Sequence, residues 1–420
     1  MKNDDIILGK NLSDGRRWLA FLSIIIIYFF YCYNFMLPTF TKVVMTETWG
    51  FTKENTSWIF GVMSLGTIPG TFIFGWFATN FGKKRTLIVI ALLIAATTAL
   101  PFINPTSVVF WRFSRFLTGV TLGGVFGTAV PLVAELFPQK YRGKLAAACT
   151  ATFSLAMIFG GFLYDALGAQ NWGLLTLTAI IPPVIGAVMT FFFVPDDADY
   201  MKTVRAQSTE KVNYFGLFKG KYAVYIILAI VLSGMNFVAY SSFTNNFVAF
   251  LQTEKGITTA GKIFAMQGFG QLAGYFFWGA VADKFGRKVP RIGFALAGGI
   301  ILYSVLSGIS SESILYVIAI SLGVMYGFSG AWGAYYSEMF PSKYRAMSAG
   351  LCFNGGRIIS SFALPYIGGL ADASGTYTPY FTAAVIASGI GVIFWSLLPE
   401  TLGKSADEIY QIDRKVEAVG

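Results

Sequence analysis

The segment ELFPQKYR at residues 135–142 decides the fold, because it recurs almost unchanged as EMFPSKYR at residues 338–345. A second pair of segments, GWFATNFGKKR at 75–85 and GAVADKFGRKV at 279–289, is related by nearly the same displacement along the chain. The displacement is 203 residues for the first pair and 204 for the second. One displacement that relates two pairs of motifs indicates a chain built by doubling a unit of that length.

Composition places these units in a lipid bilayer. Of the 420 residues, 55% are hydrophobic and only 12% are charged, whereas soluble domains carry about 25% charged residues. A membrane-spanning helix needs about 20 predominantly apolar residues. The chain is therefore predicted to be an all-α membrane protein with twelve transmembrane helices. The expected spans are 18–42, 58–80, 86–104, 107–136, 145–168, 173–195, 222–251, 258–282, 289–309, 312–338, 347–371 and 376–398.

The twelve spans divide into two sets of six. An N-terminal bundle (1–195) is followed by a polar cytoplasmic linker (196–221), a C-terminal bundle (222–398) and a cytoplasmic tail (399–420). Each repeated motif follows the second or fourth span of its set, so the two bundles are expected to have the same orientation. A parallel repeat of this kind is typical of secondary transporters, which hold substrate at the interface of the halves.

The net charge of +10 is explained by membrane topology. Most of the 31 Lys and Arg residues fall in the N-terminal segment, the loops after even-numbered spans and the tail, as the positive-inside rule requires. Both termini are therefore expected in the cytoplasm, and the charge needs no nucleic-acid partner. The first apolar run lacks a signal-peptide cleavage pattern and is expected to remain as a helix. Short basic loops fit a bacterial inner membrane.

Other protein classes find little support in the sequence. The three cysteines, Cys32, Cys149 and Cys352, lie within predicted spans and do not indicate a disulfide framework. The chain has no histidine, no metal-ligand cluster and no glycine-rich loop with a phosphate-binding lysine. An enzyme, a cofactor and ATP-driven pumping are therefore not expected.

Several motifs together resemble the major facilitator superfamily. They are the loops at 75–85 and 279–289, RFLTG at 115–119, and the E-x-x-P-x-x-x-R ends of the fourth and tenth spans. PETLGKSADEI (399–409) is similar to the sugar-porter and organic-ion branches, and NGGR (354–357) to the metabolite:proton and aromatic-acid branches. The resemblance covers essentially the whole chain and implies transport by alternating access.

The resemblance also implies a cytoplasmic gate of charge pairs that hold the two halves together in the outward-open state. In the first motif Thr79 stands where the family usually has Asp, so the N-terminal arm of the gate is expected to be weaker. The alternative is a set of surface charges that only fixes the topology. The expected gating residues are Asp283, Arg287, Glu135, Arg142, Glu338 and Arg345.

Ionisable residues inside the spans are the main functional signal, because each costs roughly 2.5–3.5 kcal/mol there and usually faces a partner or a cavity. Arg112 and Arg115 lie in the fourth span and Arg357 near the middle of the eleventh, whereas every candidate carboxylate lies near a helix end. A bound anion could supply the missing charge, since a guanidinium pairs bidentately with a carboxylate. Alternatively, Arg115 hydrogen-bonds the first helix and Arg112 extends to the interface.

The first span bears on proton coupling. YCYNFMLP (31–38) resembles a stretch in which related symporters often have Asp, but here the residue is Asn34. An amide is not protonated at physiological pH, so coupling uses another group or transport is exchange or facilitated diffusion. Asp165 is the remaining candidate for proton coupling. Asn34 either lines the cavity with Tyr31 or bonds Arg115.

These residues predict a carrier of small organic anions, monocarboxylates or aromatic acids, that works as a monomer by proton symport or anion exchange. Alternatives are a sugar or polyol carrier, favoured by the PET tail and the amides, efflux of hydrophobic compounds, and a transport-inactive sensor. VPDDADY (194–200) lacks the Glu-Ser-Pro of sugar porters. The predicted substrate-binding residues are Arg357, Arg115, Asn34, Tyr31, Asn354, Gln267, Gln271, Tyr326 and Arg112.

Overall fold

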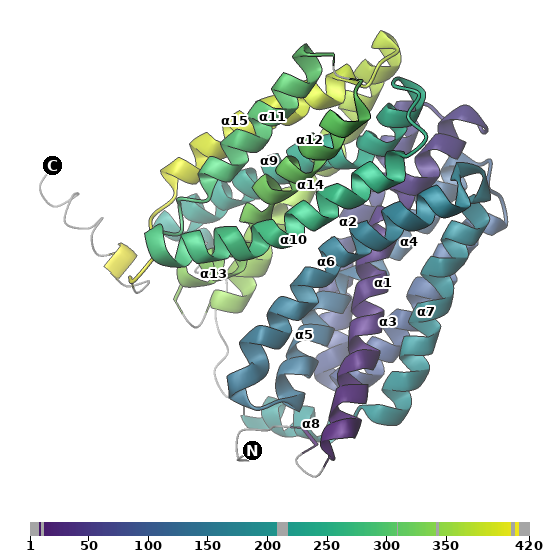
Figure 1. Ribbon diagram of the computed structural model, residues 1–420. Coiled ribbons are helices and arrows are strands. Elements are labelled where there is room, and N and C mark those ends of the chain that lie inside the picture. The colour runs from purple at the N-terminus through teal and green to yellow at the C-terminus, as the bar shows by residue number, and fades with distance from the viewer. Residues whose placement is uncertain are drawn as a thin grey trace, which may run out of the picture. The chain divides into compact units, whose positions relative to one another are not determined.

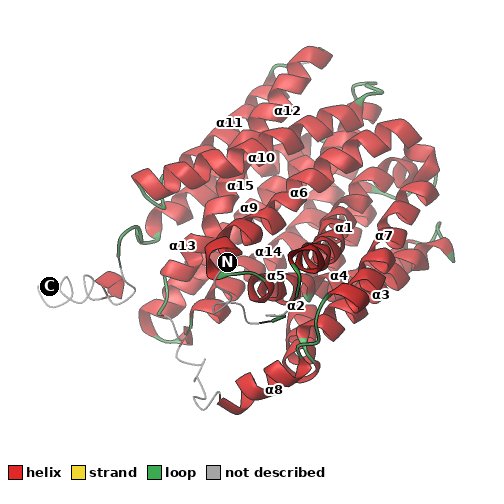
Figure 2. Ribbon diagram, turned by 60° about the horizontal axis from the view of Figure 1, so that its bottom comes forward, coloured by secondary structure: helices red, strands yellow, loops and turns green. Residues whose placement is uncertain are grey.

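The computed structural model describes residues 8–9, 12–207, 217–308, 310–341, 344–404 and 408–410, and the regular elements within these ranges are helices (Figures 1 and 2). The chain forms two compact units, Met1–Thr209 (unit 1) and Glu210–Gly420 (unit 2). The boundary between them falls within the segment 196–221.

Each of the twelve predicted spans is helical. Unit 1 contains α1 (Asp14–Glu47), α2 (Lys53–Phe81), α3 (Lys83–Ala99), α4 (Val108–Gly123), α5 (Val125–Leu136), α6 (Gln139–Leu167) and α7 (Trp172–Phe193). Unit 2 contains α9 (Gly220–Thr253), α10 (Ala260–Phe285), α11 (Arg291–Leu306), α12 (Glu312–Tyr326), α13 (Trp332–Glu338), α14 (Arg345–Ser374) and α15 (Thr378–Leu397). The fourth span is divided into α4 and α5, and the tenth into α12 and α13 with the 3₁₀ turn Gly327–Ala331 between them.

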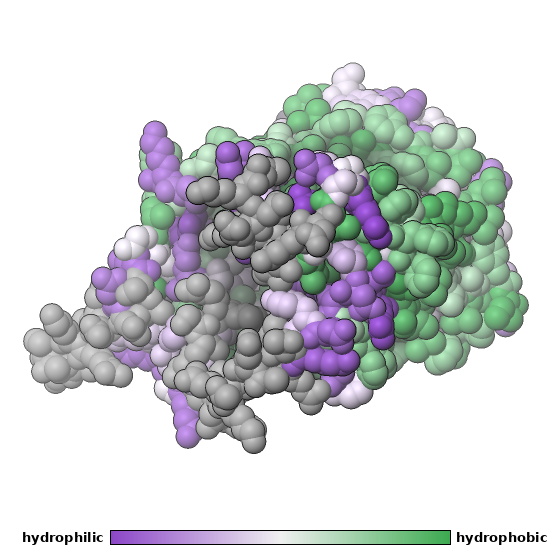
Figure 3. Space-filling model, turned by 90° about the horizontal axis from the view of Figure 1, so that it is seen from below, coloured by the Kyte–Doolittle hydropathy of each residue, from purple (hydrophilic) through white to green (hydrophobic). Residues whose placement is uncertain are grey.

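Length and apolar composition support the membrane assignment. Of the helical segments that the structure describes, nine are long and apolar enough to cross a bilayer, and Arg291–Leu306 is a shorter apolar helix. The other two expected spans, α10 and α14, form helices of 26 and 30 residues. Figure 3 views the molecule from below and shows hydrophilic residues, in purple, on the surface that faces the viewer. Hydrophobic residues, in green, cover the side surface at the right of the picture. A further α-helix that the sequence did not lead us to expect is α8 (Ala198–Gln207), in the polar segment after α7.

Side-chain caps determine where three of the spans begin. Ser13, Thr52 and Ser107 precede α1, α2 and α4, and the hydroxyl of each accepts a hydrogen bond from a backbone N–H in the first turn. A capping hydroxyl satisfies one of the N–H groups that a helix leaves unpaired at its start. Gly82, at φ +91°, ends α2 and allows the chain to turn directly into α3.

A close helix crossing built on glycines occurs at equivalent places in the two units. In unit 1, α2 crosses α4. In unit 2, α10 crosses α12 and the first residue of the 3₁₀ turn that follows it. Each crossing uses glycines spaced four residues apart on both partners. A Cβ atom at any of these glycines would overlap the backbone of the facing helix. Small residues at this spacing are what allows two membrane helices to approach so closely. The glycines are Gly66, Gly70, Gly119 and Gly123 in unit 1 and, each 204 residues later, Gly270, Gly274, Gly323 and Gly327 in unit 2.

This packing predicts opposite effects of one substitution at two positions of α2. Gly70→Ala places a methyl group against the Val120 carbonyl and should lower the stability by about 1–3 kcal/mol. Gly75→Ala meets no atom within 4 Å and should raise it by about 0.5–1 kcal/mol, because alanine favours the helix. Thermal unfolding of the two purified variants in one detergent measures the difference. Equal melting temperatures would contradict the close crossing.

Candidate functional site

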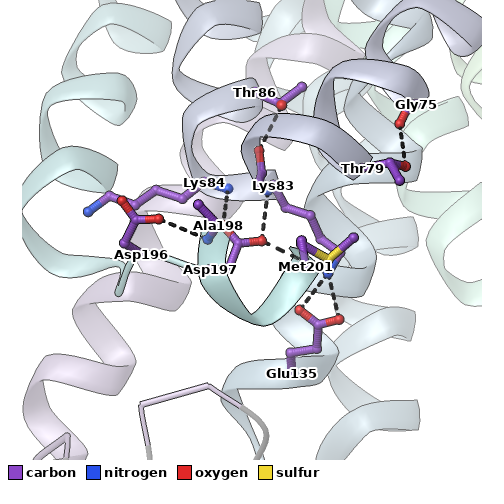
Figure 4. Close-up of polar contacts among 11 residues, drawn as sticks. Gly75, Thr79, Lys83, Lys84, Thr86, Glu135, Asp196, Asp197, Ala198 and Met201 are labelled. Carbon is purple, nitrogen blue, oxygen red and sulfur yellow. Dashed lines mark hydrogen bonds and ion pairs between the residues drawn. The ribbon is translucent and has the colours of Figure 1, made fainter. Parts of the chain in front are cut away.

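A network of carboxylates and a lysine lies at one end of unit 1 (Figure 4). Lys83, the first residue of α3, donates through Nζ to both carboxylate oxygens of Glu135, at 2.7 and 2.8 Å. Asp197 is fully buried and accepts from the backbone N–H groups of Lys83 and Lys84, at 2.7 and 3.0 Å. One Asp197 oxygen also lies 4.0 Å from Lys83 Nζ. The unpaired N–H groups at the start of α3 therefore hold a carboxylate, as the helix dipole favours.

Unit 2 repeats this network with other residues. The guanidinium of Arg287 donates to the two oxygens of Glu338 at 3.0 and 2.7 Å and also pairs with Asp283. The backbone N–H groups of Arg287 and Lys288 donate to Glu400 at 2.8 and 3.1 Å. Each unit therefore has one cation that binds the end of a span and one carboxylate that binds two successive backbone N–H groups.

The comparison of the two units reveals three residues that the sequence analysis did not select: Lys83, Asp197 and Glu400. The displacement that relates the repeated motifs could have found them, because it places Lys83 at Arg287 and Asp197 at Glu400. From the sequence, VPDDADY appears only as a departure from the Glu-Ser-Pro of sugar porters. In the structure, its Asp197 makes the contacts that Glu400 makes in unit 2.

The predicted gating residues are found in, or next to, these networks. Glu135 pairs with Lys83, and Arg287 pairs with Glu338 and Asp283, so each of these pairs lies within one unit. Contacts between the halves stay a prediction. Arg142 donates through Nε to the Phe137 carbonyl at 3.3 Å. Thr79 donates through its hydroxyl to the Gly75 carbonyl at 2.8 Å. The side chain of Arg345 lies outside the described residues.

Backbone hydrogen bonds lower the pKa of two carboxylates, Glu400 within the unit 2 network and Asp196 beside the unit 1 network. Burial raises the pKa of Glu400, but four backbone N–H groups donate to the carboxylate and bring its pKa below the ordinary value. The pKa of Asp196 is lowered first by the N–H of Ala198 and then by the hydrogen bond from Arg85. The donors to Glu400 belong to Leu402, Lys288, Arg287 and Thr401.

Arg115 is the most unusual of the predicted substrate-binding residues. It is 0% exposed, and none of its three guanidinium nitrogens has a hydrogen-bond partner among the residues that the structure describes. Its guanidinium carbon lies 5.3 Å from the ring centroid of Trp111, one turn earlier on α4. Trp111 in turn packs near Trp49 and Trp172, with centroids 6.1 and 6.3 Å away. A buried cation is thus placed against the aromatic cluster that joins the ends of α1, α4 and α7.

Arg112 and Arg357 both have polar partners on neighbouring turns or helices. Arg112 is half-buried, donates to Asn55 Oδ1 at 2.8 Å and lies over the ring of Trp58. Arg357 is also half-buried, donates through Nε to Asn354 Oδ1 at 3.2 Å and lies 4.9 Å from the ring centroid of Phe237. Asn354 and Arg357, which were both predicted to bind substrate, are therefore hydrogen-bonded to each other on α14.

Asn34 does not bond Arg115, so that alternative is not supported. Its Nδ2 donates to the carbonyls of Phe30 at 2.9 Å and Ala179 at 3.2 Å, and its Oδ1 accepts from Thr98 at 2.8 Å. The amide is fully buried and joins α1 to α3 and α7. Its neighbour in the predicted site, Tyr31, is half-buried and packs against the rings of Tyr28 and Phe35. Asp165, the predicted coupling residue, is half-buried in the last turn of α6.

The predicted residues of α10 and α12 are buried with part of their hydrogen-bonding capacity unused. Gln271 accepts from Tyr240 at 3.4 Å and donates to Tyr275 at 3.0 Å. Gln267 donates to Thr244 at 2.9 Å. Within the described part of the chain, Gln267 Oε1, the Tyr326 hydroxyl and the Trp332 indole N–H lack a hydrogen-bond partner. Polar atoms left unpaired in a buried site are candidates for contact with a ligand.

Comparison with known proteins identifies the family. The model of the Major Facilitator Superfamily matches residues 20–258 and 237–413. The chain belongs to this superfamily. The predicted fold is confirmed, and the protein is a secondary transporter with a multi-pass membrane fold.

Two relatives and one solved structure are similar over most of the chain. The chain is 28% identical over 362 residues to a putative metabolite transport protein of Haemophilus influenzae, covering 82% of this chain and 86% of that one. It is 30% identical over 325 residues to the cis,cis-muconate transport protein of Acinetobacter baylyi, covering 74% and 76%. A crystal structure of a D-xylose-proton symporter matches with a TM-score of 0.72 and 17% sequence identity, and the match covers 92% of this chain and 99% of that one. This similarity shows a shared fold.

The lowered pKa of Glu400 predicts a pH-dependent contribution to stability. A carboxylate whose pKa is lower in the folded than in the unfolded protein stabilises the fold above its unfolded pKa, about 4.3 for Glu. That contribution is lost as the pH falls through the lower, folded value. Glu400→Gln should therefore lower the melting temperature at pH 7 and make progressively less difference below about pH 4. Thermal unfolding in detergent across this range measures the effect.

Glu47→Gln, at an exposed carboxylate on α1, is the control and should leave the melting temperature unchanged at each pH. A melting temperature of Glu400→Gln equal to that of the wild type at pH 7 would contradict a stabilising network around the start of α11.

Proposed function

We propose that this transporter moves small organic anions, monocarboxylates or aromatic acids, by alternating access. The observation that carries the proposal is Arg115, whose guanidinium is fully buried without a hydrogen-bond partner among the described residues. An unpaired buried ion costs several kcal/mol, and its contact with the Trp111 ring returns about 2 kcal/mol of this. A substrate carboxylate would supply both the missing charge and bidentate acceptors.

Arg357 is the second proposed contact. Its guanidinium is only half-buried and its Nε is held by Asn354, so the side chain is positioned by its own helix. Phe237 packs against the same guanidinium at 4.9 Å and offers an apolar surface to the body of a substrate. The relative from Acinetobacter baylyi is named as a cis,cis-muconate transporter, which supports an organic anion as the substrate, although muconate is a dicarboxylate without an aromatic ring.

The energy source is proposed to be either proton symport or exchange against another anion. Asn34 leaves no carboxylate at the position on α1 where related symporters often carry one, and its amide is fully engaged with α3 and α7. Proton symport would therefore use another group, of which Asp165 on α6 is our candidate. Anion exchange requires no protonatable group, because an anion compensates the buried arginine during both inward and outward transport.

The charge networks of the two units are proposed to act as the gate of a monomeric carrier in a bacterial inner membrane, with both termini in the cytoplasm. Glu135 and Glu338 end equivalent spans and are each held by a cation at the start of the next loop or helix. Arg142 and Arg345 follow them at equivalent positions and are proposed to exchange partners as the halves rock. Unit 1 lacks a counterpart of Asp283, because Thr79 stands in its place.

A neutral solute such as a sugar or polyol is the second candidate. The observation that favours it is the set of buried neutral groups with unused hydrogen-bonding capacity on α10, α12 and α13. Gln267 Oε1, the Tyr326 hydroxyl and the Trp332 indole N–H would suit hydroxyl groups as well as they suit a polar substituent of an acid. A ligand screen distinguishes these two substrate classes.

Arg115→Gln should separate a binding role from a structural one. Removal of an uncompensated buried charge should leave the ligand-free protein as stable as the wild type or more stable. It should also abolish stabilisation by carboxylates, which for the wild type reaches about 2.7 kcal/mol at a hundredfold excess over the dissociation constant. Arg357→Gln should weaken the response as well. The measurement is a thermal-shift screen of carboxylates, aromatic acids, sugars and lipophilic cations at constant ionic strength.

Arg85→Gln, at an exposed arginine paired with Asp196, is the matched control and should respond as the wild type does. If sugars stabilise the protein and carboxylates do not, the substrate is a neutral solute and the organic-anion proposal is wrong. If Arg115→Gln unfolds readily without ligand and keeps its response to carboxylates, the arginine is structural.

A further inference from the structure

Two cations flank the last turn of α7 at the end of unit 1 where α1 and α3 begin. Arg16 of α1 donates through Nη2 to the Phe192 carbonyl at 3.2 Å. Lys84 of α3 places its ammonium 5.6 Å from the ring centroid of Phe191. Both α1 and α3 pack against α7, and the charges of the two cations interact with one another. The two side chains thus approach one helix end from opposite neighbours.

The acidic residues nearby are engaged elsewhere. Asp14 pairs with Arg17 at 3.0 Å, and Asp196 pairs with Arg85 at 2.7 Å. Asp197 accepts the backbone N–H of Lys84, and its carboxylate lies beside Lys83. Among the described residues, no carboxylate comes within ion-pair distance of Arg16 or of the Lys84 ammonium. Asp196 and Asp197 are still close enough to act on the charge of Lys84. Together with Arg16, Lys84 and Arg85 they make a group of three cations and two carboxylates, which leaves one positive charge in excess.

An exposed apolar stripe leads away from these cations along α7. Ile181, Ile185, Val188 and Phe192 follow one another at spacings of four, three and four residues, and each is between 51% and 62% exposed. Residues at this spacing share one face of a helix. The stripe rises about 16 Å at 1.5 Å per residue, which is roughly half of the 30 Å hydrocarbon core and so the depth of one leaflet.

We propose that the ends of α1, α3 and α7 form a binding site for an anionic phospholipid. The phosphate of its head group lies between Arg16 and Lys84, and one acyl chain follows the stripe along α7. Charge complementarity selects an anionic over a zwitterionic lipid, because the two cations lack a carboxylate partner and basic groups between helices at a membrane interface attract acidic head groups. The ring of Phe191 and the carbonyl of Phe192 contact the two cations and so keep them at the end of the stripe. This site is independent of the transported substrate.

The test is titration of the full-length protein in detergent with phosphatidylglycerol, followed by native mass spectrometry. Each basic residue at an anionic surface contributes about a fivefold gain in affinity, so Arg16→Gln/Lys84→Gln should weaken phosphatidylglycerol binding by about thirtyfold. The control Lys144→Gln/Lys202→Gln removes the same charge from exposed positions of unit 1 and should leave the affinity within about twofold. The charge-preserving Arg16→Lys/Lys84→Arg should also retain it.

Two further ligands identify what is bound. Phosphatidylcholine with the same acyl chains should bind the wild type at least about tenfold more weakly than phosphatidylglycerol, and its binding should not respond to the variants. Inorganic phosphate should not compete with the lipid, because the stripe contributes to binding. If Arg16→Gln/Lys84→Gln and the control Lys144→Gln/Lys202→Gln lose the same affinity for phosphatidylglycerol, the effect depends only on net charge and the proposal is overturned. Competition by free phosphate, or unchanged affinity in Arg16→Gln/Lys84→Gln, would overturn it as well.

Discussion

A bilayer offers neither water nor counter-ions to the groups within it, and this constraint governs the structure. Backbone groups are satisfied inside helices, and charges gather where helices end. At the start of α3, Lys83 binds Glu135 while its backbone N–H binds Asp197. Arg287 does the same with Glu338 and Glu400 in unit 2. Arg115 and Arg357 depart from this pattern, because both lie within spans. Arg357 has Asn354 as a partner, whereas none of the described protein groups compensates the Arg115 charge by a hydrogen bond.

The two units preserve geometry rather than residue identity. Lysine replaces arginine at the cation, and aspartate replaces glutamate at the carboxylate that binds two successive N–H groups. What is common is a carboxylate that accepts two successive backbone N–H groups, at the start of α3 in unit 1 and in the turn before α11 in unit 2. N–H groups without an intrahelical partner favour a negative charge there, whatever side chain supplies it. The crossing glycines behave differently, since a Cβ atom at any of them would overlap the facing backbone. Glycine is the same in both units there because no other residue satisfies that geometry.

The sequence predicted what depends on composition and on the repeated motifs, namely the all-helical membrane fold and the family. It did not predict contacts between residues distant in the chain. Asn34 was expected to face Arg115 or the cavity, but it bonds Thr98 and Ala179, 64 and 145 residues away. The orientation of an amide on a buried helix depends on which carbonyls its neighbours present, and no periodicity encodes this. Asp197 was within reach of the sequence, because the displacement of the repeat pointed to it.

The unsatisfied state of Arg115 agrees with what a carrier requires. A ligand shifts a conformational equilibrium only by its differential affinity for the two states, so a site that is fully satisfied when empty gives the substrate little to change. Asn34, with its donors and acceptor engaged, has no such capacity left, whereas Arg115 keeps three nitrogens unpaired against the ring of Trp111. The aromatic cluster around Trp111 holds the cation in place without neutralising it. On the proposed function, the substrate carboxylate is thus the missing partner of a buried ion pair, and its arrival lowers the cost of enclosing that charge.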